Sequence, residues 1–564
     1  MKNKIKSGMI RILNLALNIY FIFLISLFIT DYSFIINGGV SNFSIQAFIF
    51  LFLLFIRWFV EKKTFGDILF IKIINKVLKA GDFSILVFIF LFFIVIFSTI
   101  GIARHLAFSS SGCDLAATDL AIWNTAQGRI MFSSLIGNVS HFGGHFEPVL
   151  FLITPLYLLW PNIVILILLQ AIALGAAIFP LYLIAKLRLK SRFLIFAFII
   201  AYFFSRPIRG VGFLDFHTDS FLVPLSLFFY YFLVNKKTKF ALLAMFSMLL
   251  CKENTTFLIA GFGIFTFFSL KNRALGTAIF IIAVFVWILE TNILMPFFSH
   301  TKEFPYLSLL PFGKTYGENI TAVINNPTLL INLIFGPGKI DFYLKIFGPL
   351  GFLAFLSPEN YILFLVPLST QIIGSIGHPG MQTISSHYPA HTVPFIFIAS
   401  IYGAGWLIDK FGKNDKTNKK ISFFIALYLI ITSLAFYGKS DGHKLSKFIQ
   451  GVKDMRSQEV LWALKTIPAN ASVTTVNRLV PHLSHRKYIY MWENSPDLRY
   501  LTEYVVLHRR LIETDKERFD QIIAGLKERG FKAAYTDKYN DLFIFFNPNY
   551  NKELLENRQG KLII

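Results

Sequence analysis

Long apolar runs are the feature that most limits what this chain can fold into. Windows at 12–29, 44–60, 83–103 and 162–185 are each long enough to cross roughly 30 Å of hydrocarbon as a helix. The mean hydropathy is +0.60. Hydrophobic residues make up 55% of the chain, above the ~45–50% that is usual in soluble globular proteins. The sequence therefore predicts an α-helical polytopic membrane protein.

Basic residues alternate with these apolar runs. The net charge is +22, and Lys and Arg gather in short loops near residues 2–11, 57–79, 186–192, 236–239, 271–273 and 410–420. The positive-inside rule assigns such loops to the cytoplasm, and this assignment predicts about 13 spans in the cytoplasmic membrane, with a cytoplasmic N-terminus. Short dispersed loops do not form a basic groove, so we expect no nucleic-acid partner. Cys113 and Cys251 lie in different segments, so no disulfide framework is predicted.

Two windows need separate interpretation. The run 149–160 is short and lies between Pro148 and Pro161, so we predict an interfacial or re-entrant helix there. The run 342–356 is predicted to be one of the later spans.

The composition divides the chain into three parts. Residues 1–80 are predicted to form a transmembrane hairpin and a basic cytoplasmic loop, and residues 81–437 a transmembrane core with external loops. Residues 438–564 change character and are predicted to form an external soluble α/β domain. Its expected helices are 453–467 and 515–529, and its expected strands are 472–476, 487–491, 504–508, 533–536 and 542–546. Alternating strands and helices favour a small mixed or parallel sheet.

Polar and ionisable residues gather in four segments that the charge-derived topology places on the external side. These segments are 104–147, 205–220, 252–253 and 377–391. Polar groups at a membrane boundary are costly to desolvate and commonly mark a functional site. The candidate residues are Asp114, Asp119, His141, His145, Glu147, Arg206, Arg209, Asp215, His217, Lys252, Glu253, His387 and Tyr388. We therefore expect a single site at the external membrane surface.

Each candidate also has a structural interpretation. Asp114 and Asp119 can be a loop carboxylate and a charge at a helix N-terminus. Residues 215–219 can be an N-cap cluster. Lys252 and Glu253 can be an ion pair at a hairpin. His141, His145 and Glu147 are crowded as metal ligands are, but they match no sharp metal-binding motif, so the use of a divalent metal stays open.

Several segments carry a family resemblance. They are CDLAATDLAIWNTAQGR (113–129), FLDFHTDSFLVPL (213–225), LCKENTTFLIAGFGI (250–264), SHYPAHTVPFIF (386–397) and IPANASVTTVNRLVPHLSHRKYIY (467–490). From about residue 80 to 550 the chain resembles a prokaryotic polytopic family known as domain of unknown function number 2079. That family in turn resembles integral-membrane glycosyltransferases of the GT-C type, which use polyprenyl-phosphate sugar donors and carry an essential Asp in the first external loop.

The resemblance implies roles for the candidate residues. Asp114 would be the catalytic base, with Asp119 and His217 also catalytic, and His217 or His387 would be a secondary acid or an orienting group. Arg206, Arg209 and Lys252 would hold the donor phosphate, because guanidinium and ammonium groups pair with it. Asp215, Glu253, His387 and Tyr388 would help to bind substrate, and His141, His145 and Glu147 are the candidate metal ligands.

The predicted function is the transfer of a sugar from a polyprenyl-phosphate carrier to a glycan, lipid or protein acceptor on the external face. The alternative is a transporter or flippase, in which buried charges such as Glu290 would line a path. Polar residues on one side, with no second copy of the Asp114 region, favour the enzyme. A third hypothesis is a non-catalytic scaffold or sensor whose external tail binds a partner.

Overall fold

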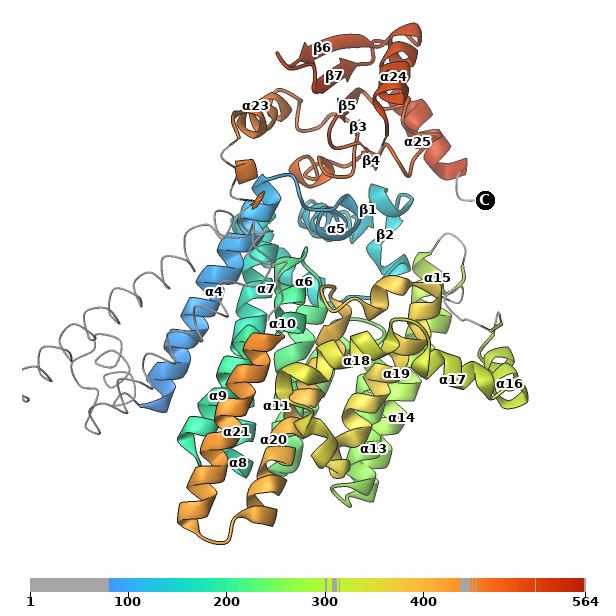
Figure 1. Cartoon of the computed structure of the whole chain (residues 1–564). Coiled ribbons are helices and arrows are strands. Elements are labelled where there is room, and N and C mark those ends of the chain that lie inside the picture. Colours follow the sequence, from blue (N-terminus) through green and yellow to red (C-terminus); the bar gives the residue numbers. More distant parts are fainter. Residues whose placement is uncertain are drawn as a thin grey trace, which may run out of the picture.

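The computed structural model describes residues 81–299, 302–306, 312–313, 315–436, 447–448, 450–452, 454–512 and 514–561. A bundle of helices forms most of the molecule, and a sheet-containing tail sits on one end of it (Figure 1). The predicted amino-terminal hairpin and basic loop, residues 1–80, lie outside the described residues.

Six helices among the described residues are long and apolar enough to cross a membrane, or seven if a bent pair counts as one span. They are α4 (Asp82–Leu106), α7 with α8 (Val164–Arg188), α14 with α15 (Arg273–Phe298), α19 with its preceding turn (Pro358–Gly377), α20 (Val393–Phe411) and α21 (Asp415–Ala435). The bent pair is α9 (Arg192–Phe204) and α10 (Arg206–Phe213), which meet at 44°. These bounds lie close to the apolar windows of the sequence.

Four shorter apolar helices supplement these spans. They are α6 (Val149–Leu159), α11 (Asp219–Val234), α12 (Thr238–Leu249) and α13 (Thr255–Phe268). The described residues therefore show a mostly helical membrane architecture. The predicted total of about 13 spans stays a prediction, because short helices such as these cross a bilayer only where it is thin or their ends are shielded.

One predicted span is wrong. The window 342–356 is not a single helix, because α18 (Lys339–Phe347) ends there and two short 3₁₀ turns follow. Gly348 and Pro349 follow the last residue of α18, and Gly351 and Phe352 have φ angles of +59° and +58°. Pro cannot donate to the helical ladder, and a left-handed residue turns the chain away from the helix axis. An apolar composition alone hides such a break.

The first polar segment folds into a platform under the tail. It contains a π-helical turn (Gly112–Ala116), α5 (Ala117–Ala126), and the short antiparallel strands β1 (Phe132–Ser133) and β2 (Val139–Ser140). Helix α6 follows and packs against α5. The predicted short helix at 149–160 is therefore present, next to the polar segment rather than among the long spans.

The tail contains a mixed five-stranded sheet with the order β4-β3-β5-β7-β6. Strands β3 (Val473–Thr475), β4 (Ile489–Met491) and β5 (Tyr504–His508) are parallel. Strands β6 (Lys532–Thr536) and β7 (Leu542–Phe546) complete it, with β7 antiparallel to both of its neighbours. Helices α23 (Met455–Leu464), α24 (Lys516–Glu528) and α25 (Lys552–Lys561) flank the sheet. The predicted strands and the two predicted helices are all present.

The tail does not close its hydrophobic core alone. Phe108, Ala116 and Leu120, from the first polar segment, are buried in the same apolar cluster as Val473 and Val505 of the sheet. Gly112 shows how close the contact is, because a Cβ there would lie 3.0 Å from both Met491 Sδ and Val480 Cβ. The tail and the first polar segment therefore form one packed unit.

The basic connections lie at the other end of the bundle. The α13–α14 and α20–α21 connections, which carry Lys271, Arg273 and Lys410, are at the end opposite the tail (Figure 1). This arrangement matches the alternation of charge and apolar runs in the sequence. It assigns neither end to a particular compartment.

The shared core makes a testable prediction. Leu120→Ala should lower the melting temperature of the detergent-solubilised protein and speed protease cleavage of the tail. Leu120 is fully buried between the platform and the tail, and such a truncation usually costs about 2–5 kcal/mol. Ile130→Ala, at an exposed position of the same segment, is the matched control. Equal effects of the two substitutions would contradict a shared core.

Candidate functional site

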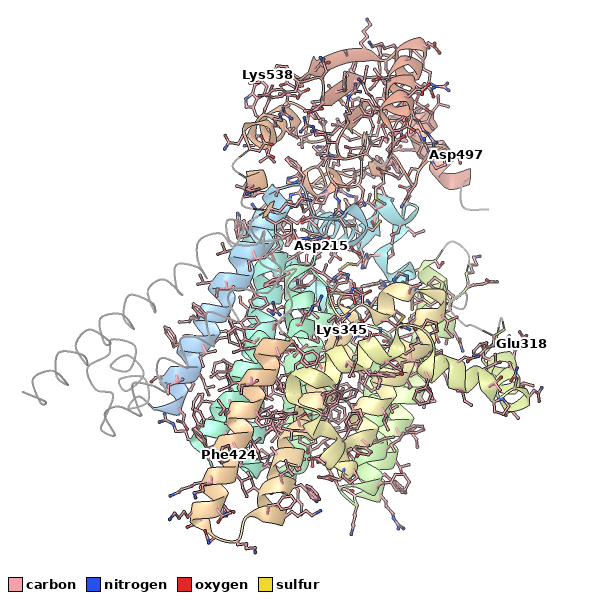
Figure 2. The ribbon with its side chains drawn as sticks, viewed as in Figure 1. Asp215, Glu318, Lys345, Phe424, Asp497 and Lys538 are labelled. Carbon is pink, nitrogen blue, oxygen red and sulfur yellow. The ribbon has the colours of Figure 1, made fainter. Side chains whose placement is uncertain are left out.

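The four polar segments meet beneath the tail. Glu253 accepts hydrogen bonds from the His145 ring (3.0 Å) and the Phe146 amide (3.1 Å), which joins the first and third segments. A Cβ at Gly210 would lie 2.4 Å from the Ile384 carbonyl oxygen, so the second and fourth segments touch backbone to backbone. Asp215 lies where the bundle meets the tail (Figure 2). The predicted convergence of the segments is therefore present in the fold.

Asp114 is an exposed carboxylate at this junction. Its side chain retains 45% exposure, and its Oδ1 lies 3.7 Å from His217 Nε2. The π-helical turn that carries it begins at Ser111, whose hydroxyl accepts a hydrogen bond from the Cys113 amide. The opposite ring nitrogen of His217, Nδ1, lies 2.9 Å from the Asp215 carbonyl oxygen, a contact that fixes the ring and directs Nε2 towards Asp114.

Two further rings support His217. The His387 ring stacks on it with 3.8 Å between centroids, and Tyr388 lies 4.0 Å from His387. Burial and the charge of His217 hold the pKa of His387 well below its ordinary value. Burial alone would lower the pKa of His217, but the interaction with Asp114 raises it. The two stacked rings therefore have pKa values shifted in opposite directions.

The same interaction also shifts the pKa of Asp114. Burial alone would raise this pKa, but the contacts with His217, together with the Arg104 charge and the Ser111 hydroxyl, outweigh burial and lower it. The result is an oriented carboxylate with space in front of it.

Asp215 has a structural role instead of an open binding role. Arg104, at the end of α4, approaches both of its carboxylate oxygens, at 2.5 and 3.2 Å. The Ser111 amide donates to it at 2.9 Å. The Gln170 amide group donates to the Asp215 carbonyl oxygen and accepts from the His217 amide. These contacts hold the Asp114 turn and the His217 loop together, and they leave Asp215 little capacity for a substrate.

Lys252 is buried in a charge network. Its Nζ lies 3.3 Å from Asp219, and His391 Nε2 lies 2.5 Å from the other Asp219 oxygen. Glu147 lies near Lys252 and is paired with His141 at 2.9 Å and with the Thr218 hydroxyl at 2.7 Å. Burial alone would raise the pKa of Glu147, but the hydrogen bond and charge of His141, together with the charges of Lys252 and His145, lower it to about 2. Carboxylates in the network already balance the Lys252 charge.

The predicted metal ligands do not form one set. His141 faces Glu147, whereas His145 faces Glu253 and stacks on Tyr306 at 5.1 Å. Within the described part of the chain, no group of three or more His, Cys, Asp or Glu side chains could hold a metal ion. The short 3₁₀ turn at His141–Gly143 directs the two imidazoles to different carboxylates. The crowding in the sequence therefore corresponds to two separate contacts between a histidine and a carboxylate.

Asp119 connects the platform to the tail. It is completely buried and accepts hydrogen bonds from the hydroxyls of Tyr157 (2.7 Å) and Ser484 (2.5 Å). The His485 ring lies 3.1 Å away. The position of Asp119 is that of an anchor, away from the open space at Asp114.

Of the remaining candidates, Arg209 is buried on α10. Arg206, at the start of α10, has a buried Nε atom with no hydrogen-bond partner among the described residues. Sequence reasoning missed Arg104, Gln170, Ser484 and His485 as members of the junction. Their only sequence signal is polarity next to apolar runs, and it does not identify the distant carboxylates that they meet.

The geometry defines a class of protein: a polytopic helical membrane protein whose mixed-sheet tail is docked on a polar platform at one end of the bundle. Within that class, the chain belongs to the DUF2079 family, described as "Predicted membrane protein", which matches residues 104–536. This range covers the four polar segments and most of the tail.

Two solved structures of ArnT from Cupriavidus metallidurans are similar to the chain. The structure bound to undecaprenyl phosphate is 11% identical, with a TM-score of 0.48 over 82% of this chain and 98% of that chain. The apo structure is 10% identical, with a TM-score of 0.44 over 80% of this chain and 97% of that chain. No curated protein matches the sequence.

The Asp119 anchor predicts a pH dependence. Burial alone would raise the pKa of Asp119 and lower that of His485, but their mutual attraction reverses both shifts. The pair therefore stabilises docking most above the ordinary Asp pKa of about 3.9 and below the ordinary His pKa of about 6.5. This stabilisation should be lost as the pH rises through the raised pKa of His485.

Melting temperatures measured from mildly acidic to alkaline pH should therefore decline for the wild type. The decline should be smaller for His485→Gln, and the remainder would reflect His217, whose pKa is also raised. His378→Gln, at an exposed histidine, is the control and should decline as the wild type does. An unchanged decline in His485→Gln would show that the pair does not hold the tail.

Proposed function

We propose that the chain is a membrane glycosyltransferase of the GT-C type, which transfers a sugar from a polyprenyl-phosphate carrier to an acceptor. One observation carries the proposal. Asp114 is half exposed, whereas the neighbouring Asp119, Glu147, Asp215 and Asp219 are buried and paired. An exposed carboxylate can accept a proton from a substrate hydroxyl, whereas the buried carboxylates around it are already paired. Oriented carboxylates of this kind serve as general bases.

The chemistry proceeds by displacement at the anomeric carbon of the donor. The acceptor oxygen forms the new bond to that carbon and its proton passes to Asp114, while the bond to the phosphate oxygen breaks and polyprenyl phosphate leaves. His217 touches Asp114 and holds its carboxylate in place. The stack of His387 on His217 and the Arg104–Asp215 pair restrict the motion of this assembly. Such restriction favours catalysis, because a group already in position need not be reorganised during the reaction.

The leaving phosphate needs a cation. Lys252 is a poorer partner than the sequence suggests, because Asp219 and Glu147 already neutralise it in a buried network. Arg206 begins α10 at the bend of the α9–α10 pair and has a buried Nε atom without a hydrogen-bond partner among the described residues. We therefore assign the donor phosphate to Arg206, whose planar guanidinium suits a phosphate.

The proposal keeps the topology derived from charge. The amino terminus is cytoplasmic, residues 81–437 form the membrane core of a protein with about 13 spans, and residues 438–564 lie outside the cytoplasm with the platform. Basic connections at the end opposite the tail support this orientation. The site then faces the compartment in which the lipid-linked donor and the acceptor meet.

Replacing the base tests the reaction. Asp114→Asn keeps the shape of the side chain but removes its ability to take a proton, so transfer from a polyprenyl-phosphate sugar should fall by about 10²–10⁴-fold. Binding of a short-chain polyprenyl phosphate should change little. Asp497→Asn, at an exposed carboxylate of the tail (Figure 2), should retain wild-type activity. Full activity of Asp114→Asn would overturn the assignment of the base.

Replacing the cation tests the donor site. Arg206→Gln should weaken binding of a short-chain polyprenyl phosphate by about tenfold to a hundredfold, since a charge-assisted hydrogen bond is worth roughly 1.5–3 kcal/mol. Arg273→Gln, at the exposed first residue of α14, at the opposite end of the bundle, is the matched control. Binding affected equally by both substitutions would make these arginines headgroup anchors. Retained binding with no transfer to any acceptor would favour the transporter.

A further inference from the structure

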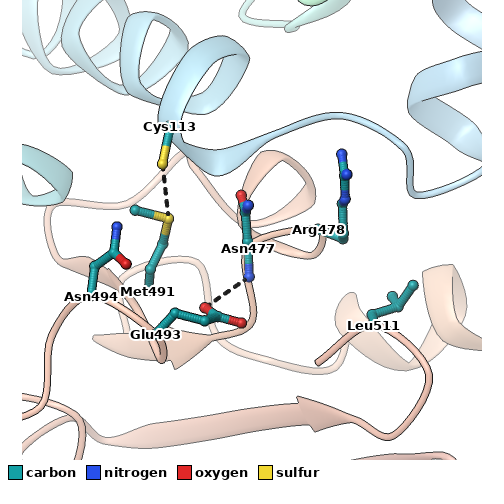
Figure 3. A pocket seen from close by; sticks show the side chains of 7 residues that line it. All are labelled: Cys113, Asn477, Arg478, Met491, Glu493, Asn494 and Leu511. Carbon is teal, nitrogen blue, oxygen red and sulfur yellow. Dashed lines mark hydrogen bonds between the residues drawn. The ribbon is translucent and has the colours of Figure 1, made fainter. Parts of the chain in front are cut away.

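A polar pocket lies between the tail and the platform, next to Asp114. Its volume is about 160 Å³, and its lining residues are Cys113, Asn477, Arg478, Met491, Glu493, Asn494 and Leu511 (Figure 3). The proposed reaction assigns no role to it. Its volume is smaller than the roughly 300–1,000 Å³ of pockets for drug-sized ligands, so its occupant is a group the size of one ring.

Strand topology explains why a pocket forms here. β3, β4 and β5 are parallel, and Asn477, Glu493 and Leu511 each follow the carboxyl end of one of them. β4 lies on one side of β3 and β5 on the other, so the connections from β3 to β4 and from β4 to β5 run in opposite directions along the sheet. In open sheets with parallel strands, ligands bind outside the carboxyl ends of the strands at such a switch point.

The lining favours a neutral, hydrogen-bonding ligand. One guanidinium (Arg478) and one carboxylate (Glu493) balance each other, and Asn477 and Asn494 contribute amides. A phosphate would meet the charge of Glu493, and a cation would meet that of Arg478. Met491 and Leu511 add apolar surface. Donors and acceptors on apolar surface complement the hydroxyls and carbon face of a sugar ring.

The pocket is tied to the Asp114 turn by specific contacts. Cys113 precedes Asp114 in the π-helical turn, and its Sγ lies 3.8 Å from Met491 Sδ. The backbone N–H of Gly112 donates to Asn477 Oδ1 at 2.6 Å, and the backbone N–H of Asn477 donates to Glu493 Oε2 at 3.2 Å. Arg478 donates to the Ser109 carbonyl oxygen at 2.8 Å. Movement of the pocket therefore moves the turn that carries the proposed base.

We propose that this pocket binds one neutral sugar ring of the acceptor, and that the acceptor of the proposed transferase is accordingly a glycan. The pocket lies between the turn that carries Asp114 and the tail, and the tail sits on one end of the bundle (Figure 1), so we expect a lipid-borne donor to reach the site from the bundle side. The tail thereby selects the acceptor. This inference rests on the proposed function, but its test measures binding alone.

Cys113 provides a reporter within the pocket. It is exposed, whereas Cys251 is buried, so a maleimide should label Cys113 in the folded chain. Burial and the neighbouring charges of Asp114 and Glu493 raise the pKa of the Cys113 thiol, so labelling is followed at mildly alkaline pH. Free glucose, galactose, mannose and N-acetylglucosamine are the probes, with inorganic phosphate as the charged competitor. A sugar present at ten times its Kd should slow labelling about tenfold.

Asn494→Ala should weaken protection by the effective sugar about threefold to tenfold, the effect of losing one hydrogen bond. Asn494 is exposed, and its side chain makes no hydrogen bond to another described residue, so folding should persist. A Cys251 thiol that stays unreactive would verify the fold. Gln521→Ala, an exposed amide on α24, is the control and should leave protection unchanged.

Protection by a sugar that Asn494→Ala weakens and Gln521→Ala does not would support the inference. Protection by phosphate instead of sugars, or by none of the four sugars, would overturn it. Either result leaves the tests at Asp114 and Arg206 unaffected, so the proposed transferase and the glycan acceptor can fail separately.

Discussion

The burial of Asp119 is the constraint on which the junction depends. A carboxylate removed from water is strongly unfavourable unless hydrogen-bond donors and positive charge surround it. Tyr157 comes from the platform, but Ser484 and His485 come from the tail, more than 360 positions away in the sequence. Asp119 is therefore satisfied only when the tail is docked. Docking in turn places Asn477 against Gly112, and so fixes the turn that presents Asp114.

A division of labour among the carboxylates follows from the same rule. Asp215 holds Arg104, Asp219 holds Lys252 and His391, and Glu147 holds His141 and Thr218. Each of these three acids contacts at least one basic or hydroxyl side chain, which is how charged groups persist in a low-dielectric setting. These pairs build a rigid floor under the exposed acid. Asp114 contacts His217 at a distance longer than a hydrogen bond, which leaves its oxygens accessible.

Sequence patterns predicted the elements well where periodicity and turn residues agree. β5 and β7 have the predicted bounds, and the spans Asp82–Leu106 and Val164–Arg188 lie close to the predicted windows 83–103 and 162–185. The gathering of the four polar segments also followed from charge and span alternation. The span predicted over 342–356 was wrong, because the apolar composition of this window conceals the helix break at Gly348 and Pro349. Sequence patterns could not assign partners either: Asp119 and Asp114 are both acids of one short stretch, and only the fold shows that one is an anchor and the other is open.

The core shared by the platform and the tail has a consequence for the biogenesis of the protein. Phe108, Ala116 and Leu120 are translated well before the sheet residues that cover them, such as Val473 and Val505. During synthesis and membrane insertion these apolar side chains stay exposed until the sheet has been translated. Contacts between such distant parts of a chain form slowly, because a long loop must close first. Folding of the proposed catalytic turn is thus coupled to synthesis of the tail. A nascent protein cannot assemble the site before the strands of the sheet have been translated.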